Sequence, residues 1–246
     1  MNTLDPNKVR ALTRHTVTIL KKDVTTSTND DLKSLAAETE HTRPVVLFAD
    51  KQTAGRGRQG RSFFSEGGLY MSVLFPTLGE EARYLTHVAA VAVGEAISAE
   101  TGLPARVKWV NDVYMEGKKV CGILAESFEA RGARRYVLGI GVNVGTPKGL
   151  LPEEIRSVAA FFDGDKSALA ARILNVLFGL LQGFDLADLR ARYAALSFLT
   201  GRRLNVLKED EKPATVVGLS DGLGLLVRYD DGSIEELIAG EVHLIL

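Results

Sequence analysis

Residues 45–75 read VVLFADKQTAGRGRQGRSFFSEGGLYMSVLF, and this stretch decides how the chain folds. The apolar run Val45–Ala49 is typical of a buried strand, and Leu69–Phe75 predicts a second strand. Between them, Lys51–Gly68 predicts a loop rich in glycine and arginine. Its Gly-x-Gly-x-x-Gly pattern resembles a dinucleotide fingerprint, but a strand follows it instead of a helix. No Gly-Lys-Ser/Thr ends the loop, so it is not a P-loop either.

The part of this loop between Lys51 and Arg61 contains four cations and no acid. Its glycines let the backbone approach a ligand closely, and backbone N–H groups in such turns form anion-binding concavities. Arginine adds a planar fork that suits phosphate or carboxylate oxygens. The loop therefore predicts a phosphate or carboxylate site, with a solvated basic surface loop as the plain alternative.

The rest of the chain predicts a mixed α/β body followed by a small all-β module. Helices are expected at Leu32–Glu38, Glu81–Thr101, Pro152–Phe162, Lys166–Phe184 and Leu186–Leu196. Further strands are expected at Arg106–Val110, Val113–Met115, Val120–Phe128, Arg135–Val144, Arg203–Leu207, Ala214–Leu219, Gly224–Tyr229, Ser233–Leu237 and Glu241–Ile245. The texture changes after Gly201, so we expect domains at 1–198 and 199–246.

Composition narrows the functional classes. The 246 residues are 46% hydrophobic and carry a formal net charge of −1, whereas a dedicated nucleic-acid binder is usually basic. The single cysteine, Cys121, excludes an internal disulfide and a cysteine zinc site, which fits a cytoplasmic protein. No signal peptide precedes the body and no run approaches the ~20 apolar residues of a membrane span, so no membrane role is expected.

Two further polar segments stand at the ends of predicted elements. Lys108–Asp112 ends a strand, and Lys119 opens the next long one, where it could project an ammonium into a sheltered site. Turn chemistry and a strand-edge charge are the plain alternatives. Ser27–Asp31 fits a capping box before a helix, and a helix start can also offer donors to a polar ligand.

These segments occur in the same order in biotin–protein ligases, which the chain resembles from about residue 24 to its end. The matching motifs are Ser27-Thr28-Asn29, Gln52 with Gly55–Arg61, Lys108-Trp109-Val110-Asn111-Asp112, Lys119-Val120-Cys121-Gly122-Ile123-Leu124 and Gly139–Val144. The resemblance implies an α+β fold: a mixed, largely antiparallel sheet flanked by helices, like class II synthetases and lipoate ligases. It also implies a small C-terminal SH3-like barrel.

The resemblance also implies roles for individual residues. Biotin would be bound by Ser27, Thr28, Asn29, Gln52, Gly55, Arg56 and Gly122. ATP or the adenylate would be bound by Gly57, Arg58, Arg61, Phe63, Lys119 and Asn143. Lys119, Arg58 and Asp112 would be catalytic, and Asn111 would serve a metal. Val110 stands where the family usually has proline, and Phe63 where it often has tryptophan.

The implied activity is an ATP- and Mg²⁺-dependent ligation of biotin to a lysine of a biotin carboxyl carrier domain. Larger members begin with a DNA-binding domain; only 26 residues precede Ser27, so no DNA binding is expected. The resemblance is compatible with a homodimer. A lipoate–protein ligase is the rival enzyme, and an RNA- or partner-binding protein that uses the basic loop is the rival from another class.

Overall fold

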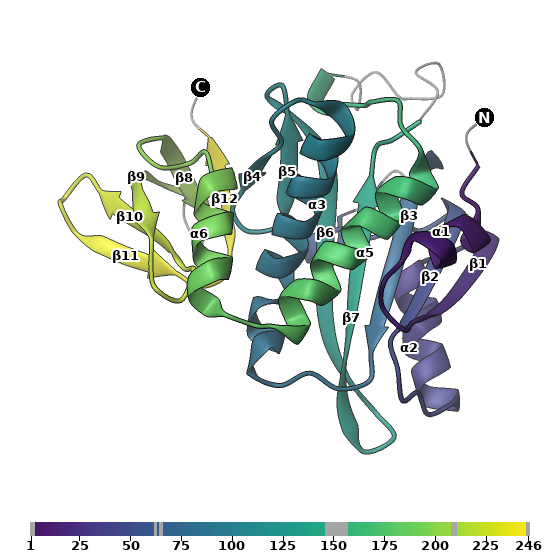
Figure 1. Ribbon diagram of the computed structural model, residues 1–246. Helices are drawn as coiled ribbons and strands as arrows, with labels where there is room; N and C mark the ends of the chain where they lie inside the picture. The colour runs from purple at the N-terminus through teal and green to yellow at the C-terminus, as the bar shows by residue number, and fades with distance from the viewer. Residues whose placement is uncertain (1–2, 62, 64–65, 146–156, 208–210, 245–246) are drawn as a thin grey trace.

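The computed structural model describes residues 3–61, 63, 66–145, 157–207 and 211–244, in which a large mixed sheet carries helices on both faces (Figure 1). Its strand order is β1-β2-β3-β7-β6-β5-β4; β1 and β2 are parallel and every other pair is antiparallel. The strands are β1 (Thr18–Thr25), β2 (Val45–Gln52), β3 (Glu66–Phe75), β4 (Arg106–Lys108), β5 (Asp112–Met115), β6 (Lys118–Ala130) and β7 (Ala133–Val142). This confirms the predicted fold class.

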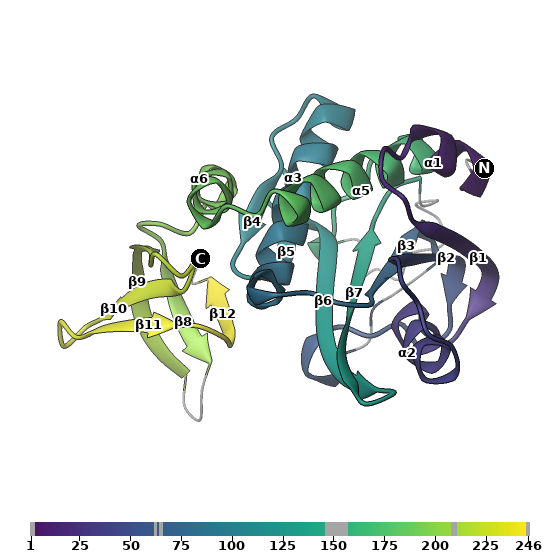
Figure 2. The same cartoon turned by 60° about the horizontal axis from the view of Figure 1, so that its bottom comes forward.

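The helices cover both faces of this sheet, but one face carries more helices than the other. They are α1 (Pro6–Leu12), α2 (Thr28–Glu38), α3 (Leu85–Thr101), α5 (Lys166–Gln182) and α6 (Leu186–Leu196). In Figure 2, α1, α3 and α5 lie above the sheet and α2 lies below it. The face that carries α2 is therefore covered by helix over only part of its area, which leaves room for a site.

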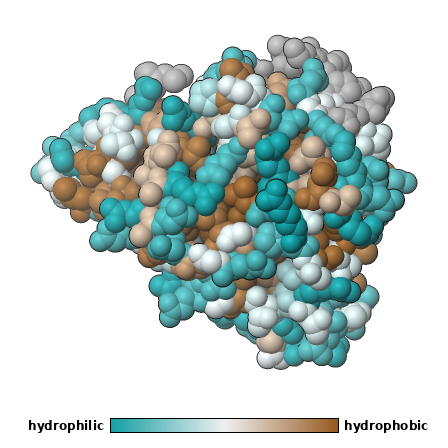
Figure 3. Space-filling model, in the orientation of Figure 1, coloured by the Kyte–Doolittle hydropathy of each residue, from teal (hydrophilic) through white to brown (hydrophobic). Residues whose placement is uncertain are grey.

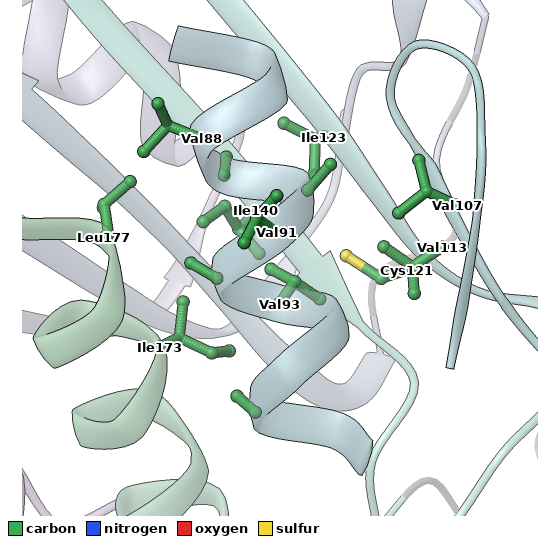
Figure 4. Close-up of a cluster of buried hydrophobic side chains, with 14 of the residues drawn as sticks. Val88, Val91, Val93, Val107, Val113, Cys121, Ile123, Ile140, Ile173 and Leu177 are labelled. Atoms are coloured by element: carbon green, nitrogen blue, oxygen red, sulfur yellow. The ribbon is translucent and has the colours of Figure 1, made fainter. Parts of the chain in front are cut away.

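The main core lies between the sheet and α3. Figure 4 shows Val88, Val91 and Val93 of this helix among Ile123 and Ile140 from the central strands. Complete burial of such side chains stabilises a fold by about 1.5–3 kcal/mol each. Cys121 belongs to this core, and burial raises the pKa of its thiol, which confirms that it is a small core residue and not a nucleophile.

The last strands form a second, antiparallel sheet beside the first. It contains β8 (Arg203–Leu207), β9 (Glu211–Leu219), β10 (Leu225–Tyr229), β11 (Ile234–Leu237) and β12 (Glu241–Leu244), in the order β11-β10-β9-β8-β12. Trp109 Nε1 donates a hydrogen bond to the Leu223 carbonyl oxygen at 3.2 Å and so ties the two sheets together. Figure 3 shows an apolar patch at the left over these strands. Ile234 of β11 and Ile238, just after it, are exposed.

Several predicted boundaries need correction. The helix expected from Leu32 begins at Thr28, because Ser27 caps it by accepting a hydrogen bond from the Asp30 backbone N–H. The strand expected to reach Val110 ends at Lys108, and the Trp109–Val110 peptide bond is cis. The first part of the helix expected at Pro152–Phe162, residues 152–156, lies outside the described residues. In its described part, Ser157 and Val158 are helical, whereas Ala159 and Phe162 pair with Lys119 and Val144 in isolated β-bridges.

Two N-terminal elements, α1 and β1, were not predicted. β1 is an edge strand whose middle is occupied by charged residues, so it shows no apolar alternation. Among the described helices, none combines the length and apolar character that crossing a membrane would require.

Candidate active site

A cavity of about 160 Å³ lies against the face of the large sheet that carries α2. Its walls come from the start of α2, the glycine–arginine loop, the central strands and the C-terminal sheet. The residues that line it are Ser27, Thr28, Asn29, Gln52, Arg56, Gly57, Arg58, Arg61, Phe63, Met71, Lys108, Trp109, Asn111, Asp112, Lys119, Gly122, Ile123, Leu124, Gly139, Ile140, Gly141, Gly240 and Val242. The three polar segments of the sequence therefore meet at one place.

One end of the cavity is polar and uncharged. The parallel register pairs Thr25 with Gln52, which brings the end of β2 beside the start of α2. Gln52 Oε1 accepts a hydrogen bond from the Thr28 backbone N–H at 2.9 Å and lies 3.0 Å from Thr28 Oγ1. Thr28 and Asn29 are buried. This end can bind a small ligand through directed hydrogen bonds.

The glycine–arginine loop brings cations to the cavity wall. A 3-10 turn at Arg58–Gly60 is closed by the Gly57 N–H, which donates to the Arg61 carbonyl oxygen at 2.7 Å. Arg58 donates to Asn111 Oδ1 at 3.1 Å and to the Gly240 carbonyl oxygen at 2.9 Å. These contacts hold the guanidinium at the junction of the two sheets, on the cavity wall.

Arg56 also lines the cavity, and its guanidinium forms an ion pair with Asp30 in the first turn of α2. This pair links the glycine–arginine loop to the helix that supplies the polar end. The loop is fastened further by its backbone, since the Thr53 and Ala54 N–H groups donate to the carbonyl oxygens of residues 25 and 26 at 2.8 and 2.9 Å.

Lys119 adds an ammonium to the cations of the wall. It lies at the start of β6, and its Nζ forms an ion pair with Asp112 Oδ1 of β5 at 2.7 Å. A side chain at Gly122 would place its Cβ 3.4 Å from Lys119 Nζ, so glycine leaves room for the ammonium. Arg58 and Lys119 thus line the same cavity, as the sequence predicted.

Phe63 covers part of the cavity floor. Its ring lies edge-on to Tyr70, with ring centres 6.4 Å apart. A Cβ at Gly141 would lie only 2.5 Å from this ring, and one at Gly122 would lie 3.1 Å from it. Glycine at position 141 therefore leaves the space that the ring occupies.

Two predicted site residues do not line the cavity. The Gly55 carbonyl oxygen accepts from the Phe63 N–H at 2.8 Å and orders the loop instead. Asn143 Nδ2 donates to the Ala160 carbonyl oxygen at 3.1 Å, which joins the end of β7 to the following segment. Conversely, Gly240 and Val242 line the cavity but were not predicted, because only folding brings the last sheet to this site.

The side chains of the cavity could supply only some of the ligands of a metal ion. Within the described part of the chain, no group of three or more His, Cys, Asp or Glu side chains could hold a metal ion. Asp112 is the only acid among the described residues that line the cavity, and Asn111 Oδ1 beside it accepts from Arg58. These two side-chain oxygens fit a Mg²⁺ ion that is coordinated mainly by phosphate oxygens and water.

Comparison with known proteins agrees with this geometry. Residues 22–143 match the Biotin/lipoate A/B protein ligase family. The chain is 34% identical to the Biotin–[acetyl-CoA-carboxylase] ligase of Mycobacterium tuberculosis, covering 89% of this chain and 86% of that protein. The biotin protein ligase of Aquifex aeolicus, solved in complex with biotin and ATP, superposes with a TM-score of 0.79 at 31% identity, over 93% of this chain and 98% of that one.

A relative with a further activity matches over a similar span. The Bifunctional ligase/repressor BirA of Bacillus spizizenii is 31% identical, over 92% of this chain and 74% of that protein. At this identity and coverage, the chain belongs to the biotin protein ligases of the biotin/lipoate A/B protein ligase family.

Proposed function

We propose that this protein activates biotin with ATP and transfers it to a lysine of a carboxylase carrier domain. One observation carries the proposal: a single cavity joins a polar end formed by Thr28 and Gln52 to a cationic wall that includes Arg58 and Lys119. Biotin has a neutral cyclic urea at one end and a carboxylate at the other. The urea suits the polar end, and the carboxylate then points toward the cations.

In the first step, a carboxylate oxygen of biotin attacks the α-phosphorus of ATP, and pyrophosphate leaves with the electrons of the broken P–O bond. Two anions must meet, so the site has to neutralise negative charge. The ammonium of Lys119 and the guanidinium of Arg58 are held by Asp112 and Asn111 before any ligand arrives. Such preorganised charges stabilise the transition state without reorganisation.

Mg²⁺ is the metal we expect with the nucleotide, where it would shield the phosphate charge. Asn111, in the turn between β4 and β5, and Asp112, the first residue of β5, are the residues that would reach it. Because these two oxygens already have protein partners, we expect the ion to arrive with ATP and not to stay bound without it.

In the second step, the neutral amine of the carrier lysine attacks the acyl carbon of biotinyl-adenylate and AMP leaves. The amine must lose a proton, and Asp112 is the acceptor we propose, being the one carboxylate among the described lining residues. The glycine–arginine loop and Phe63 would shield the anhydride from water until the carrier arrives. Protease cleavage at Arg56 or Arg61 should then slow when biotin and ATP are added; an unchanged rate would exclude this shielding.

We further propose that residues 1–198 form the catalytic domain and residues 199–246 a C-terminal domain. α6 ends at Leu196, and the second sheet begins at Arg203. Because Gly240 and Val242 line the cavity, the C-terminal domain would complete the site and not merely flank it.

Biotin-dependent ATP–pyrophosphate exchange tests the proposed activity against its rivals. We expect exchange with biotin and none with lipoate, since the dithiolane ring of lipoate has no N–H group for the polar end. Exchange with lipoate alone would identify the rival enzyme. RNA binding that weakens steeply with salt, without any exchange, would favour the non-enzymatic alternative. That alternative is disfavoured by Arg58, whose guanidinium is hydrogen-bonded within the cavity wall.

A further inference from the structure

A continuous path of hydrogen bonds runs beneath the polar end of the cavity. Thr28 Oγ1, which lies beside Gln52, is 2.7 Å from Ser72 Oγ. Ser72 Oγ donates to Asn29 Oδ1 at 2.6 Å, and Asn29 Nδ2 donates to Glu126 Oε2 at 2.7 Å. Ser72 is fully buried, and neither it nor Glu126 lines the cavity. The path therefore connects a cavity wall to a carboxylate that a ligand in the cavity would not touch.

Glu126 fixes the direction of this path. Burial raises the pKa of Glu126, but hydrogen bonds from Lys33 and Asn29 lower this pKa by more. The pKa therefore lies below its ordinary value. The carboxylate is therefore ionised at neutral pH and can only accept hydrogen bonds. Leu124 places a second acceptor, its carbonyl oxygen, 3.5 Å from the same Asn29 nitrogen. The amide must turn its NH₂ to these acceptors, which leaves Oδ1 facing Ser72.

The single hydrogen of each hydroxyl then has a definite place. Asn29 Oδ1 can only accept, so the Ser72 hydrogen points to it. Thr28 Oγ1 lies within donating distance of both Gln52 Oε1, at 3.0 Å, and Ser72 Oγ, at 2.7 Å. Because the Ser72 hydrogen points to Asn29, the shorter contact needs the Thr28 hydrogen. Gln52 Oε1 keeps its hydrogen bond from the Thr28 backbone N–H. With its hydrogen committed to the protein, the Thr28 hydroxyl can only accept from a ligand.

The packing around Asn29 leaves its amide little freedom to turn in another direction. A Cβ at Gly139 would lie 2.6 Å from Asn29 Oδ1 and 3.2 Å from its Nδ2. Glycine on β7 thus makes the space in which the amide sits between Ser72 and Glu126.

We propose that Ser72 and Glu126 are positioning residues that make Thr28 a hydrogen-bond acceptor and so select the N–H group of a cyclic urea. This inference rests on the proposed function, because it takes biotin as the ligand of the cavity. It assigns selectivity against rings without an N–H donor to two residues outside the cavity. Asn29 then acts through Ser72 and Thr28 and not by direct contact with the urea.

Calorimetric titration of the full chain with three ligands tests the proposal. The first ligand is biotin, and the other two are isosteres, each of which has one of the two ureido N–H groups replaced by a ring oxygen. The test variants are Ser72→Ala and Glu126→Gln. The matched controls are Ser167→Ala, a buried serine outside the cavity, and Glu129→Gln, a glutamate on the same strand whose partner is Arg134. Thermal unfolding confirms that every variant is folded.

We expect each test variant to bind biotin roughly 10-fold more weakly, since one oriented hydrogen bond is lost. Affinity for the isostere that lacks the selected N–H should change much less, so the preference for biotin falls by a similar factor. A merely structural role would weaken biotin and this isostere equally, and that result overturns the proposal, as do unchanged affinities. If the parent chain binds no biotin, the proposed function fails as well. Parent binding with unaltered preference in the variants overturns this inference alone.

Discussion

Replacing Lys119 by methionine should abolish most biotin activation while the protein stays folded. Lys119 Nζ lies 2.7 Å from Asp112 Oδ1, and the two side chains are 35% and 20% exposed. Methionine retains the apolar stem but removes the ammonium, so the packing beside Gly122 is largely kept. The change therefore isolates the positive charge from the volume of the side chain.

The two consequences should differ strongly in size. Loss of one preorganised donor typically costs about 2.7–4 kcal/mol of transition-state stabilisation, so the adenylation rate should fall roughly 10²- to 10³-fold. The free energy of unfolding should fall much less. A partly exposed ion pair contributes about 1 kcal/mol or less, because solvent screens it.

Biotin-dependent ATP–pyrophosphate exchange measures the first quantity, and urea-induced unfolding measures the second. Lys118→Met is the matched control: it makes the same chemical change one residue earlier in β6, at an exposed position outside the cavity. We expect this control to keep the parent exchange rate. Exchange by Lys119→Met within 10-fold of the parent, in a folded protein, would refute the assigned role of the ammonium.

Three further changes test other parts of the site and fold. Arg58→Ala removes the contacts to Asn111 and Gly240, so biotinyl-adenylate should escape roughly 10-fold faster in a filter-retention assay; equal retention would count against it. Gly141→Ala places a Cβ 2.5 Å from the Phe63 ring and should lower the free energy of unfolding by about 1–3 kcal/mol in urea; an unchanged value would show that the ring moves without cost. Burial lowers the pKa of His87 from 6.5 to about 4, so the unfolded chain binds more protons between these values and stability falls as pH drops through them. The parent should lose about 3 kcal/mol across this window through His87, and His87→Leu should lose correspondingly less; identical pH profiles would contradict the assignment.

The sequence indicated the chemical segments well because each one breaks a local pattern. The glycine–arginine loop interrupts two apolar strands, and Lys119 opens a strand that is otherwise apolar. Such interruptions are visible without a fold. Of the residues expected at the site, only Gly55 and Asn143 lie outside the cavity wall. Both lie near the cavity, and their polar groups form hydrogen bonds with the backbone of neighbouring segments.

The remaining parts depend on contacts that span the chain. Gly240 reaches Arg58 across 182 residues, and Glu126 reaches Asn29 across 97. No local pattern marks either pair. Ser72 is the exception, since a hydroxyl within the apolar run Leu69–Phe75 is a visible anomaly that predicts a buried polar partner. The edge strand β1 escaped prediction for the opposite reason, because its charged residues conceal the strand pattern.

Intact-mass spectrometry of a carrier domain tests the function most directly. The full chain is incubated with biotin, ATP, Mg²⁺ and the carrier, beside a carrier whose target lysine is replaced by arginine. We expect the first carrier to gain the mass of one biotin less one water, and the second to stay unchanged. An unmodified first carrier in the presence of folded protein, or a shift that also occurs without ATP, would contradict biotin ligation.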